Sequence, residues 1–79
     1  MFFVYAIRSD HHKYIYVGLT SNIQNRLTFH NNGYERTTKP YRPFVLIYSE
    51  AFPDRIAARV KEKYLKSGIG KDFLRSLKP

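Results

Sequence analysis

The sequence predicts a single α+β domain, in which helices pack on a small three-stranded, antiparallel or mixed sheet in the order β-β-α-β-α-α. Two bulk observations support one folded domain. The chain has 79 residues, which suits one compact domain over residues 1–79 and is too short for two. Hydrophobic residues make up 43% of the chain and aromatic residues 16%, which favours a packed core over disorder. The third observation is the order in which strand-like and helix-like segments follow one another.

The first two segments are predicted to form a β-hairpin. Residues 2–7 are rich in β-branched and aromatic side chains, and turn-like residues follow them. Strand character resumes over residues 14–18, which leaves a connecting loop of about five residues. Side chains alternate between the two faces of a strand, so Tyr5 and Tyr16 can share one face. We therefore expect these two tyrosines to lie close together on neighbouring strands.

A helix is expected after the hairpin, within the sequence TSNIQNRLTFHNNG. Ser21 or Asn22 can cap its start, and the pair Asn32-Gly33 can end it. Residues spaced i, i+4 and i+7 form its apolar stripe: Ile23, Leu27 and His30. Arg26 borders this stripe.

Three further segments complete the predicted order. Residues 34–43 contain two prolines and are basic, which indicates a loop. The sequence FVLIYSE, residues 44–50, has the strongest strand character, and its apolar residues on both faces predict a central strand. A second long helix opens at Pro53 and Asp54 and ends at Gly68. Its predicted apolar face is Ile56, Ala57, Val60 and Tyr64. A last short helix is expected in GKDFLRSL.

The charge of the chain indicates a polyanionic partner. Lys and Arg total 14 against six Asp and Glu, which gives a formal net charge of +8. Such an excess favours nucleic acid first and an anionic membrane surface second. The alternative is a basic protein whose charge only keeps it soluble.

Composition also excludes several classes of protein. The sequence has no cysteine, which excludes disulfides and thiolate metal sites. No apolar run approaches the roughly 20 residues that a membrane-spanning helix needs. The apolar opening MFFVYAI has no basic segment before it and no small-residue cleavage site after it, so we interpret it as a strand. We therefore expect a cytoplasmic protein without a membrane partner.

Five stretches resemble the GIY-YIG nuclease family, in particular its small stand-alone members. FVY at residues 3–5 and YVG at residues 16–18 resemble the paired tripeptides that name the family. GLTSNIQNRLTFHNNG resembles its helix with arginine-leucine and histidine, and TTKPYRPFVLIYSE resembles its loop and third strand. DRIAARVKEKYLKSG resembles the helix that supplies a metal-binding glutamate. The chain departs from the pattern at Phe3, where the tripeptide has glycine, and at Leu19, where some relatives carry lysine.

The resemblance implies a DNA endonuclease of the GIY-YIG type, a hydrolase that cleaves a phosphodiester by tyrosine-assisted attack of water. Its catalytic residues would be Tyr5, Tyr16, Arg26, His30 and Glu62. One phenol would take a proton from the water and the other would orient the water or the phosphate. Arg26 would hold the scissile phosphate through two parallel hydrogen bonds, and His30 would help to position water or the leaving group.

The resemblance also implies one divalent cofactor ion, Mg²⁺ or Mn²⁺, bound by Glu62 with waters and a phosphate oxygen. The alternative for Glu62 is a surface ion pair with Lys66 at i, i+4, which stabilises a helix by about 0.2–0.5 kcal/mol. Arg26 could instead be a surface residue, His30 a hydrogen-bonded packing residue, and the tyrosines ordinary sheet residues. The geometry that decides is whether Glu62 faces the tyrosines.

The expected partner is DNA, in branched or damaged form, with a role in DNA repair or recombination and with a recruiting protein as a further partner. Gly18 can let a ligand approach the backbone closely, and basic side chains can bind phosphates without reading sequence. The expected nucleic-acid contacts are Gly18, Lys39, Arg42 and Lys66. The alternative function is a catalytically silent nucleic-acid-binding module of the same fold.

Overall fold

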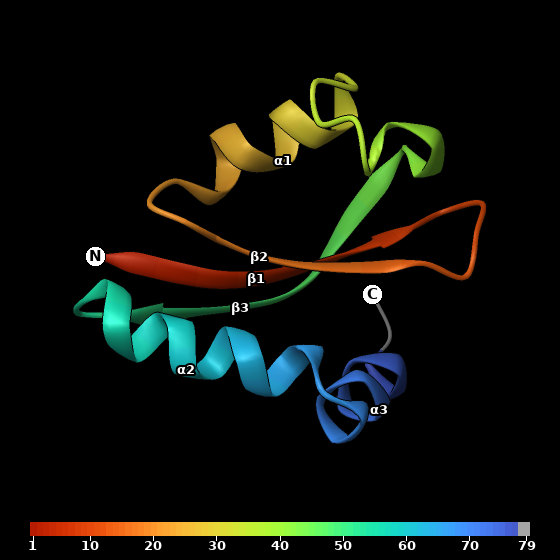
Figure 1. Ribbon diagram of the computed structural model, residues 1–79. Coiled ribbons are helices and arrows are strands. Elements are labelled where there is room, and N and C mark those ends of the chain that lie inside the picture. The colour runs from red at the N-terminus through yellow and green to blue at the C-terminus, as the bar shows by residue number, and fades with distance from the viewer. Residues whose placement is uncertain (78–79) are drawn as a thin grey trace.

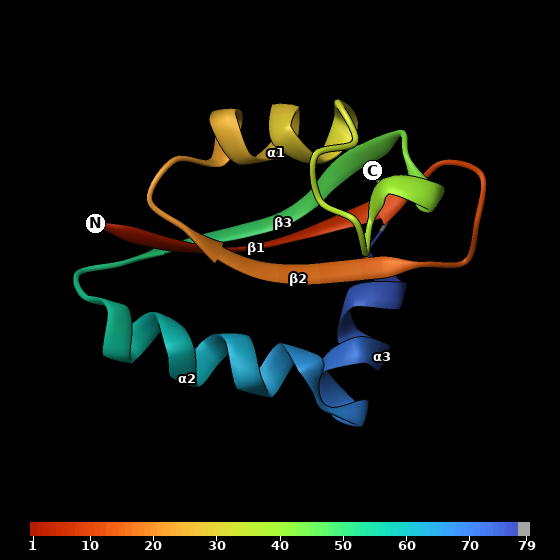
Figure 2. The same ribbon diagram turned by 45° about the horizontal axis from the view of Figure 1, so that its top comes forward.

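A computed structural model describes residues 1–77 as an α+β fold in the predicted order. Its elements are β1 (Phe2–Ser9), β2 (Ile15–Thr20), α1 (Ile23–Asn31), the short 3₁₀ helix η1 (Lys39–Tyr41), β3 (Phe44–Phe52), α2 (Arg55–Lys66) and α3 (Gly68–Ser76). The strands form one antiparallel sheet in the order β2-β1-β3. Helix α1 covers one side of this sheet, and α2 and α3 cover the other (Figures 1 and 2). The predicted fold class is confirmed.

The central strand is β1, so the prediction of a central position for residues 44–50 was wrong. Residues 4–7 of β1 are all buried, since β1 has a partner strand on each edge and helices over both faces. Strand β3 lies at the edge of the sheet, and Phe44 is its one fully buried residue. It contacts α1 on one side of the sheet and α2 on the other. These contacts explain its apolar residues on both faces without a second partner strand.

The hairpin forms as predicted. Strands β1 and β2 pair in antiparallel register, joined by a loop over residues 10–14. Tyr5 lies opposite Gly18, and Ile7 lies opposite Tyr16. This register places Tyr5 and Tyr16 on the same face, with 6.3 Å between their ring centroids. The expected proximity of the two phenols is confirmed.

The two faces of the sheet bury different side chains. The side covered by α2 and α3 holds an aliphatic cluster: Val4, Ala6, Val17, Ala58, Leu65 and Leu74. The side covered by α1 holds an aromatic cluster built on Tyr5, Ile7 and Phe44, with Tyr14, Tyr16, Leu27 and Tyr41 packed against it. Alternate residues of β1 serve the two clusters because successive strand side chains point to opposite faces.

Helix α1 begins and ends where the sequence predicts. The Asn22 side chain accepts a hydrogen bond from the backbone N–H of Asn25 at 3.0 Å, which satisfies one free donor of the first turn. Asn32 ends the helix, and Gly33 follows with a φ of +79°, a conformation that favours glycine. These local signals fix the length of α1, and with it the positions of Arg26 and His30.

The buried face of α2 is Ala58, Glu62 and Leu65. The predicted face was wrong, since Ile56 is 80% exposed and Val60 is 67% exposed. The physical reason is that α2 packs on β1 and β2, which buries the side that carries Ala58, Glu62 and Leu65. At the junction with α3 the approach is close, since a Cβ on Gly70 would lie only 2.5 Å from the Cα of Leu65. Within residues 1–77, no helix has the length and apolar character needed to cross a membrane.

A single serine separates the last two helices. Ser67 ends α2, and its hydroxyl accepts a hydrogen bond from the N–H of Gly70 at 3.2 Å at the start of α3. The second helix therefore stops just short of the predicted Gly68, and the final helix begins at Gly68. This sharp junction sets α3 against the hairpin end of the sheet (Figure 1).

Candidate active site

A chain of buried hydrogen bonds runs through the α1 side of the sheet. The phenol oxygen of Tyr5 lies 2.8 Å from Nε2 of His30. The other imidazole nitrogen, Nδ1, lies 2.9 Å from the hydroxyl of Thr38. The same hydroxyl is 3.4 Å from the backbone carbonyl of Glu35, to which it donates. His30 and Thr38 are completely buried, so their polar groups need one another as hydrogen-bond partners.

The direction of each hydrogen bond follows from counting protons. Thr38 has one hydroxyl proton and gives it to the Glu35 carbonyl, so its oxygen accepts from Nδ1–H of His30. A neutral imidazole has a single N–H, which leaves Nε2 as the acceptor for the Tyr5 hydroxyl. Burial and then the charge of Arg26 lower the pKa of His30, which favours this neutral form.

The Tyr5 phenol is held in its protonated form. Burial, the largest cause, raises the pKa of Tyr5 to about 12. The guanidinium of Arg26 opposes this rise, while negative charge at Tyr16 and Glu62 adds to it. Tyr5 therefore cannot act as a free phenolate near neutral pH. It can accept a proton only as it passes its own to His30.

Gly18 makes room for this phenol. A Cβ at Gly18 would lie 2.6 Å from the Cζ atom of Tyr5, well inside van der Waals contact. The ring of Tyr5 thus occupies the space above the opposite residue of β2. The structure shows the space above Gly18 filled by the ring of Tyr5. The expected contact of Gly18 with nucleic acid stays a prediction.

Arg26 and Tyr16 complete the cluster. Arg26 lies one turn before His30 on α1, and its guanidinium carbon sits 4.4 Å from the ring centroid of Phe29. Its Nε is buried without a hydrogen-bond partner among the described residues. The ring of Tyr16 lies 4.9 Å from that of His30. The hydroxyl of Tyr16 and the open donor of Arg26 can together bind an anionic oxygen, whereas Tyr5 and His30 already donate their protons to His30 and Thr38.

Glu62 lies on α2, across the sheet from α1 (Figure 2). Glu62 belongs to the buried face of α2, and it is 8% exposed. One carboxylate oxygen is 3.2 Å from Nζ of Lys66 and the other is 3.6 Å from Nε of Arg59. The ion pair expected from the i, i+4 spacing is therefore present. The rings of Tyr5 and Tyr16 lie on the α1 side of the sheet, so Glu62 does not share their layer, and its negative charge has the smallest of the effects that raise the pKa of Tyr5.

Glu62 is the one carboxylate that the sequence predicts as a ligand of a divalent ion. Within residues 1–77, no three His, Asp or Glu side chains gather in a metal-binding group. Mg²⁺ fits a donor set of this kind, because it keeps most of its waters and takes further oxygens from a substrate phosphate. Glu62 is nearly buried, and its charge is already offset by the side chains of Lys66 and Arg59.

The predicted basic contacts fall into two groups. Lys39 and Arg42 are exposed on the loop after α1, and both lie against Gly33. Lys66 is exposed on α2, on the opposite side of the sheet, where it pairs with Glu62. Only Lys39 and Arg42 thus belong to the layer that carries Tyr5 and His30.

Thr38 is the site residue that sequence reasoning missed. It lies in an irregular loop, so no helical or strand period marks it as buried. The loop folds back because η1 follows and the Glu35 side chain accepts from the N–H of Thr37 at 2.9 Å. The only sequence signal is a pair of hydroxyl residues before Lys39-Pro40, which does not distinguish a buried threonine from an exposed one.

The chain is similar in sequence to several known proteins. The family model described as the GIY-YIG catalytic domain matches residues 1–72. The UPF0213 protein SH2523 of Staphylococcus haemolyticus is 33% identical over 66 residues, which cover 82% of this chain and 79% of that protein. The UPF0213 protein CPE1444 of Clostridium perfringens is 33% identical over 67 residues, or 84% and 71% of the two chains. The UPF0213 protein DP2720 of Desulfotalea psychrophila is 39% identical over 54 residues, 66% of this chain and 49% of its own length. No solved structure matches significantly.

Proposed function

We propose a function in DNA cleavage from the premise that the chain belongs to the GIY-YIG family of nuclease catalytic domains. The proposed activity is a metal-dependent DNA endonuclease that hydrolyses a phosphodiester. The observation that supports it most is the hydrogen-bonded chain from Tyr5 through His30 to Thr38, beside the open guanidinium of Arg26. A purely structural histidine would need no arginine and second phenol next to it.

In the proposed reaction, Tyr5 and His30 act as one proton acceptor. Water attacks the phosphorus and gives a proton to the Tyr5 oxygen, while the Tyr5 proton moves to Nε2 of His30 along their 2.8 Å hydrogen bond. The imidazolium then keeps its Nδ1–H bonded to Thr38. Tyr16, half-buried beside His30, orients the water. The bond between phosphorus and the 3′ oxygen breaks, and the 3′ oxygen takes a proton from a solvent water, which yields a 5′ phosphate and a 3′ hydroxyl.

Arg26 is proposed to bind the scissile phosphate. A guanidinium stays protonated at any working pH and can donate two parallel hydrogen bonds to a phosphodiester. The unpartnered Nε of Arg26 supports this role, since a phosphate oxygen would satisfy a donor that lacks a partner among residues 1–77. The fixed charge also offsets the negative charge that grows on the phosphate in the transition state.

Glu62 is proposed to hold the divalent ion, Mg²⁺ or Mn²⁺. Nucleases of this family generally use a divalent metal ion. When bound, the ion polarises the phosphodiester and stabilises charge on the leaving 3′ oxygen. The chain itself contributes the orientation of the carboxylate, which Arg59 and Lys66 hold from two sides.

The proposed substrate is branched or damaged DNA, handled in repair or recombination in the cytoplasm. Lys39 and Arg42 would bind the backbone beside the cluster, and Lys66 would bind it from the α2 layer. Such contacts carry no sequence information, so selection would depend on the structure of the DNA or on a recruiting protein.

One observation favours a second candidate, a silent nucleic-acid-binding module. The Glu62 carboxylate is already engaged by Arg59 and Lys66. If these ion pairs persist with DNA bound, the chain would bind DNA with a strong salt dependence and show no metal-dependent turnover.

Incubation of purified protein with branched, nicked and single-stranded DNA in Mg²⁺ or Mn²⁺ tests the two candidates. We expect cleavage by the wild type and a loss of about 10²-fold or more in Arg26→Ala and Glu62→Ala. Lys63→Ala, which removes an exposed charge next to Glu62, is the matched control and should cleave normally. Equal activity in all four proteins would contradict the proposed function. Binding without cleavage under every condition, unchanged in Glu62→Ala, would select the silent module.

A further inference from the structure

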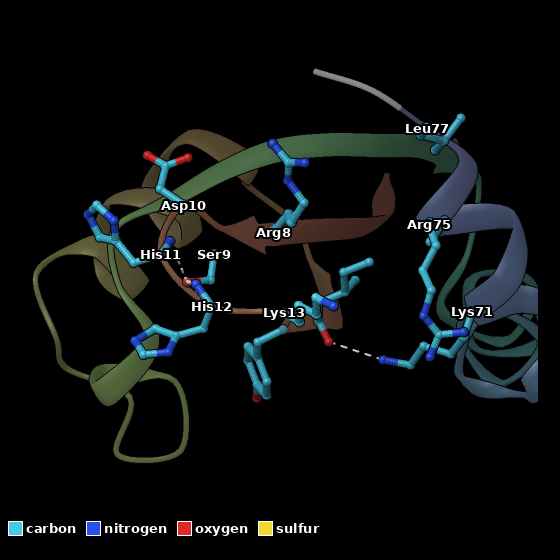
Figure 3. Close-up of a pocket in the computed structure, with 12 residues that line it drawn as sticks. Arg8, Ser9, Asp10, His11, His12, Lys13, Lys71, Arg75 and Leu77 are labelled. Atoms are coloured by element: carbon cyan, nitrogen blue, oxygen red, sulfur yellow. Dashed lines mark hydrogen bonds between the residues drawn. The ribbon is translucent and has the colours of Figure 1, made fainter.

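A second concave site lies away from the catalytic cluster. It is a cavity of about 700 Å³ between the loop that joins β1 to β2 and helix α3. Figure 3 shows Arg8 and Lys13 on the hairpin and Lys71 and Arg75 on α3. None of the proposed catalytic residues lines it. The proposed reaction leaves this cavity unexplained.

The cavity is strongly cationic. Four basic side chains line it, against the single carboxylate of Asp10: Arg8, Lys13, Lys71 and Arg75. Nζ of Lys71 donates to the backbone carbonyl of Ile15 at 3.0 Å, which fixes the ammonium at the wall (Figure 3). The charge of Arg75 acts against that of Lys71, and a bound anion would relieve this repulsion.

Two observations indicate that these cations are not fully satisfied. The Nε atom of Arg8 is buried and has no hydrogen-bond partner within residues 1–77. The pKa of Lys71 is lowered, first by burial and then by the charges of Arg75 and Lys66. Arg75 does pair with Asp72 at 2.9 Å, but both side chains are exposed, and such pairs contribute little.

The remaining wall is apolar. Ile15, Leu74 and Leu77 line the cavity. A volume of about 700 Å³ lies in the range of sites that hold small organic ligands. Cationic side chains next to an apolar surface suit a nucleotide, whose phosphate meets the charges and whose base covers the apolar wall.

We propose that this cavity binds a phosphodiester-linked nucleotide of a single-stranded nucleic-acid segment, separate from the phosphate at Arg26. The identity of the polyanion rests on the proposed function, while the binding itself needs no catalysis. Arg8 shares its face of β1 with Val4 and Ala6, so the cavity opens on the α2 and α3 side of the sheet. One segment of the nucleic acid would thus be bound at the hairpin end of the sheet. Another segment would lie across the α1 side.

Fluorescence anisotropy with a labelled oligothymidylate in EDTA tests the proposal. The double variant Lys13→Gln, Arg75→Gln removes two exposed cations of the cavity. The matched control Arg55→Gln, Lys63→Gln removes two exposed cations of α2. We expect the cavity variant to bind about tenfold or more weakly than the control, and its salt slope to fall by about 1.4, or about 0.7 per lost phosphate contact. Equal losses in the two variants would overturn the proposal.

Inorganic phosphate provides the second arm of the experiment. At constant ionic strength, replacement of chloride by millimolar phosphate should leave the oligothymidylate bound. Complete displacement of the oligothymidylate would overturn the proposal that the cavity binds a nucleic-acid strand, since the cavity would then be a site for free phosphate. Because EDTA prevents turnover, these outcomes are independent of cleavage. A wild type that binds through the cavity yet never cleaves would contradict the proposed function alone.

Discussion

The two sides of the sheet differ in what they bury. The side under α2 and α3 is an aliphatic cluster in which Leu65 and Leu74 are completely buried. The side under α1 buries Tyr5, His30 and Thr38, which are joined by hydrogen bonds. Apolar burial stabilises without directional demands, whereas each buried polar group on the α1 side must keep its partner. One strand, β1, thus links a side that chiefly stabilises to a side that carries chemistry.

Glu62 is the exception that connects the two sides. It is a carboxylate in the aliphatic layer, held by Arg59 and Lys66, and its charge reaches Tyr5. An ionised side chain that is nearly buried costs free energy unless it is paired. A packing argument alone would not predict a carboxylate between Ala58 and Leu65 on the buried face of α2.

The largest expected effect on stability lies on the aliphatic side. Leu65→Ala should lower the free energy of unfolding by about 2–5 kcal/mol, because a fully buried leucine is replaced by a cavity. Urea unfolding measures this change. Cleavage per folded molecule should stay near the wild-type value. A variant of normal stability that loses cleavage would break the proposed division between the two sides.

Gly18→Ala is expected to lower both the stability of the protein and its rate of cleavage. The new methyl group would collide with the Tyr5 ring and push the phenol away from His30. We expect a loss of about 1–3 kcal/mol of stability from overpacking. Cleavage should fall by more than the folded fraction explains, which urea unfolding and initial rates on the same sample can separate. An active, stable Gly18→Ala protein would contradict the role given to this close contact.

Thr38→Val keeps the shape of the side chain but removes the acceptor for Nδ1–H of His30. The buried donor would be left without a partner, at a cost of about 1–3 kcal/mol. Because Thr38 positions His30 and does not touch substrate, we expect kcat to fall by about tenfold with little change in KM. Thr38→Ser, which restores the hydroxyl, should recover most of the rate. A Thr38→Ser protein no faster than Thr38→Val would argue for a packing role only.

The smallest expected effect is the pH dependence of stability. The pKa of His30 is below its ordinary value of about 6.5, so the folded protein resists a proton that the unfolded chain accepts. This contribution is complete above pH about 6.5 and is lost as the pH falls through the folded pKa. Urea unfolding between pH about 7.5 and 5 should show a steeper fall for the wild type than for His30→Gln. Parallel curves for the two proteins would contradict a buried neutral imidazole.

The parts of the fold that sequence reasoning predicted are those with local signals. Asn22 and Gly33 bound α1 because capping depends on a few adjacent residues. Tyr5 and Tyr16 share a face because strand alternation has a fixed period. The convergence of these phenols with Arg26 and His30 then requires only that α1 pack on that face.

The parts that it missed depend on contacts distant in sequence. The central position of β1 depends on which edges find partners, and the apolar residues of β3 do not reveal this. The rotation of α2 depends on its packing on β1 and β2, so Val60 points to solvent although its spacing suggests a buried face. Thr38 acquires its role only when the loop closes over His30.

A double-mutant cycle on cleavage rates tests most directly whether Tyr5 and His30 form one proton acceptor. The proteins are Tyr5→Phe, His30→Gln and the double variant, measured at saturating DNA and metal. Each single change should lower kcat by about 10²–10⁴-fold. The double variant should be no slower than the slower single variant, because either change already removes the shared proton path. Losses that multiply in the double variant would mean that the two residues act independently, and would contradict the account.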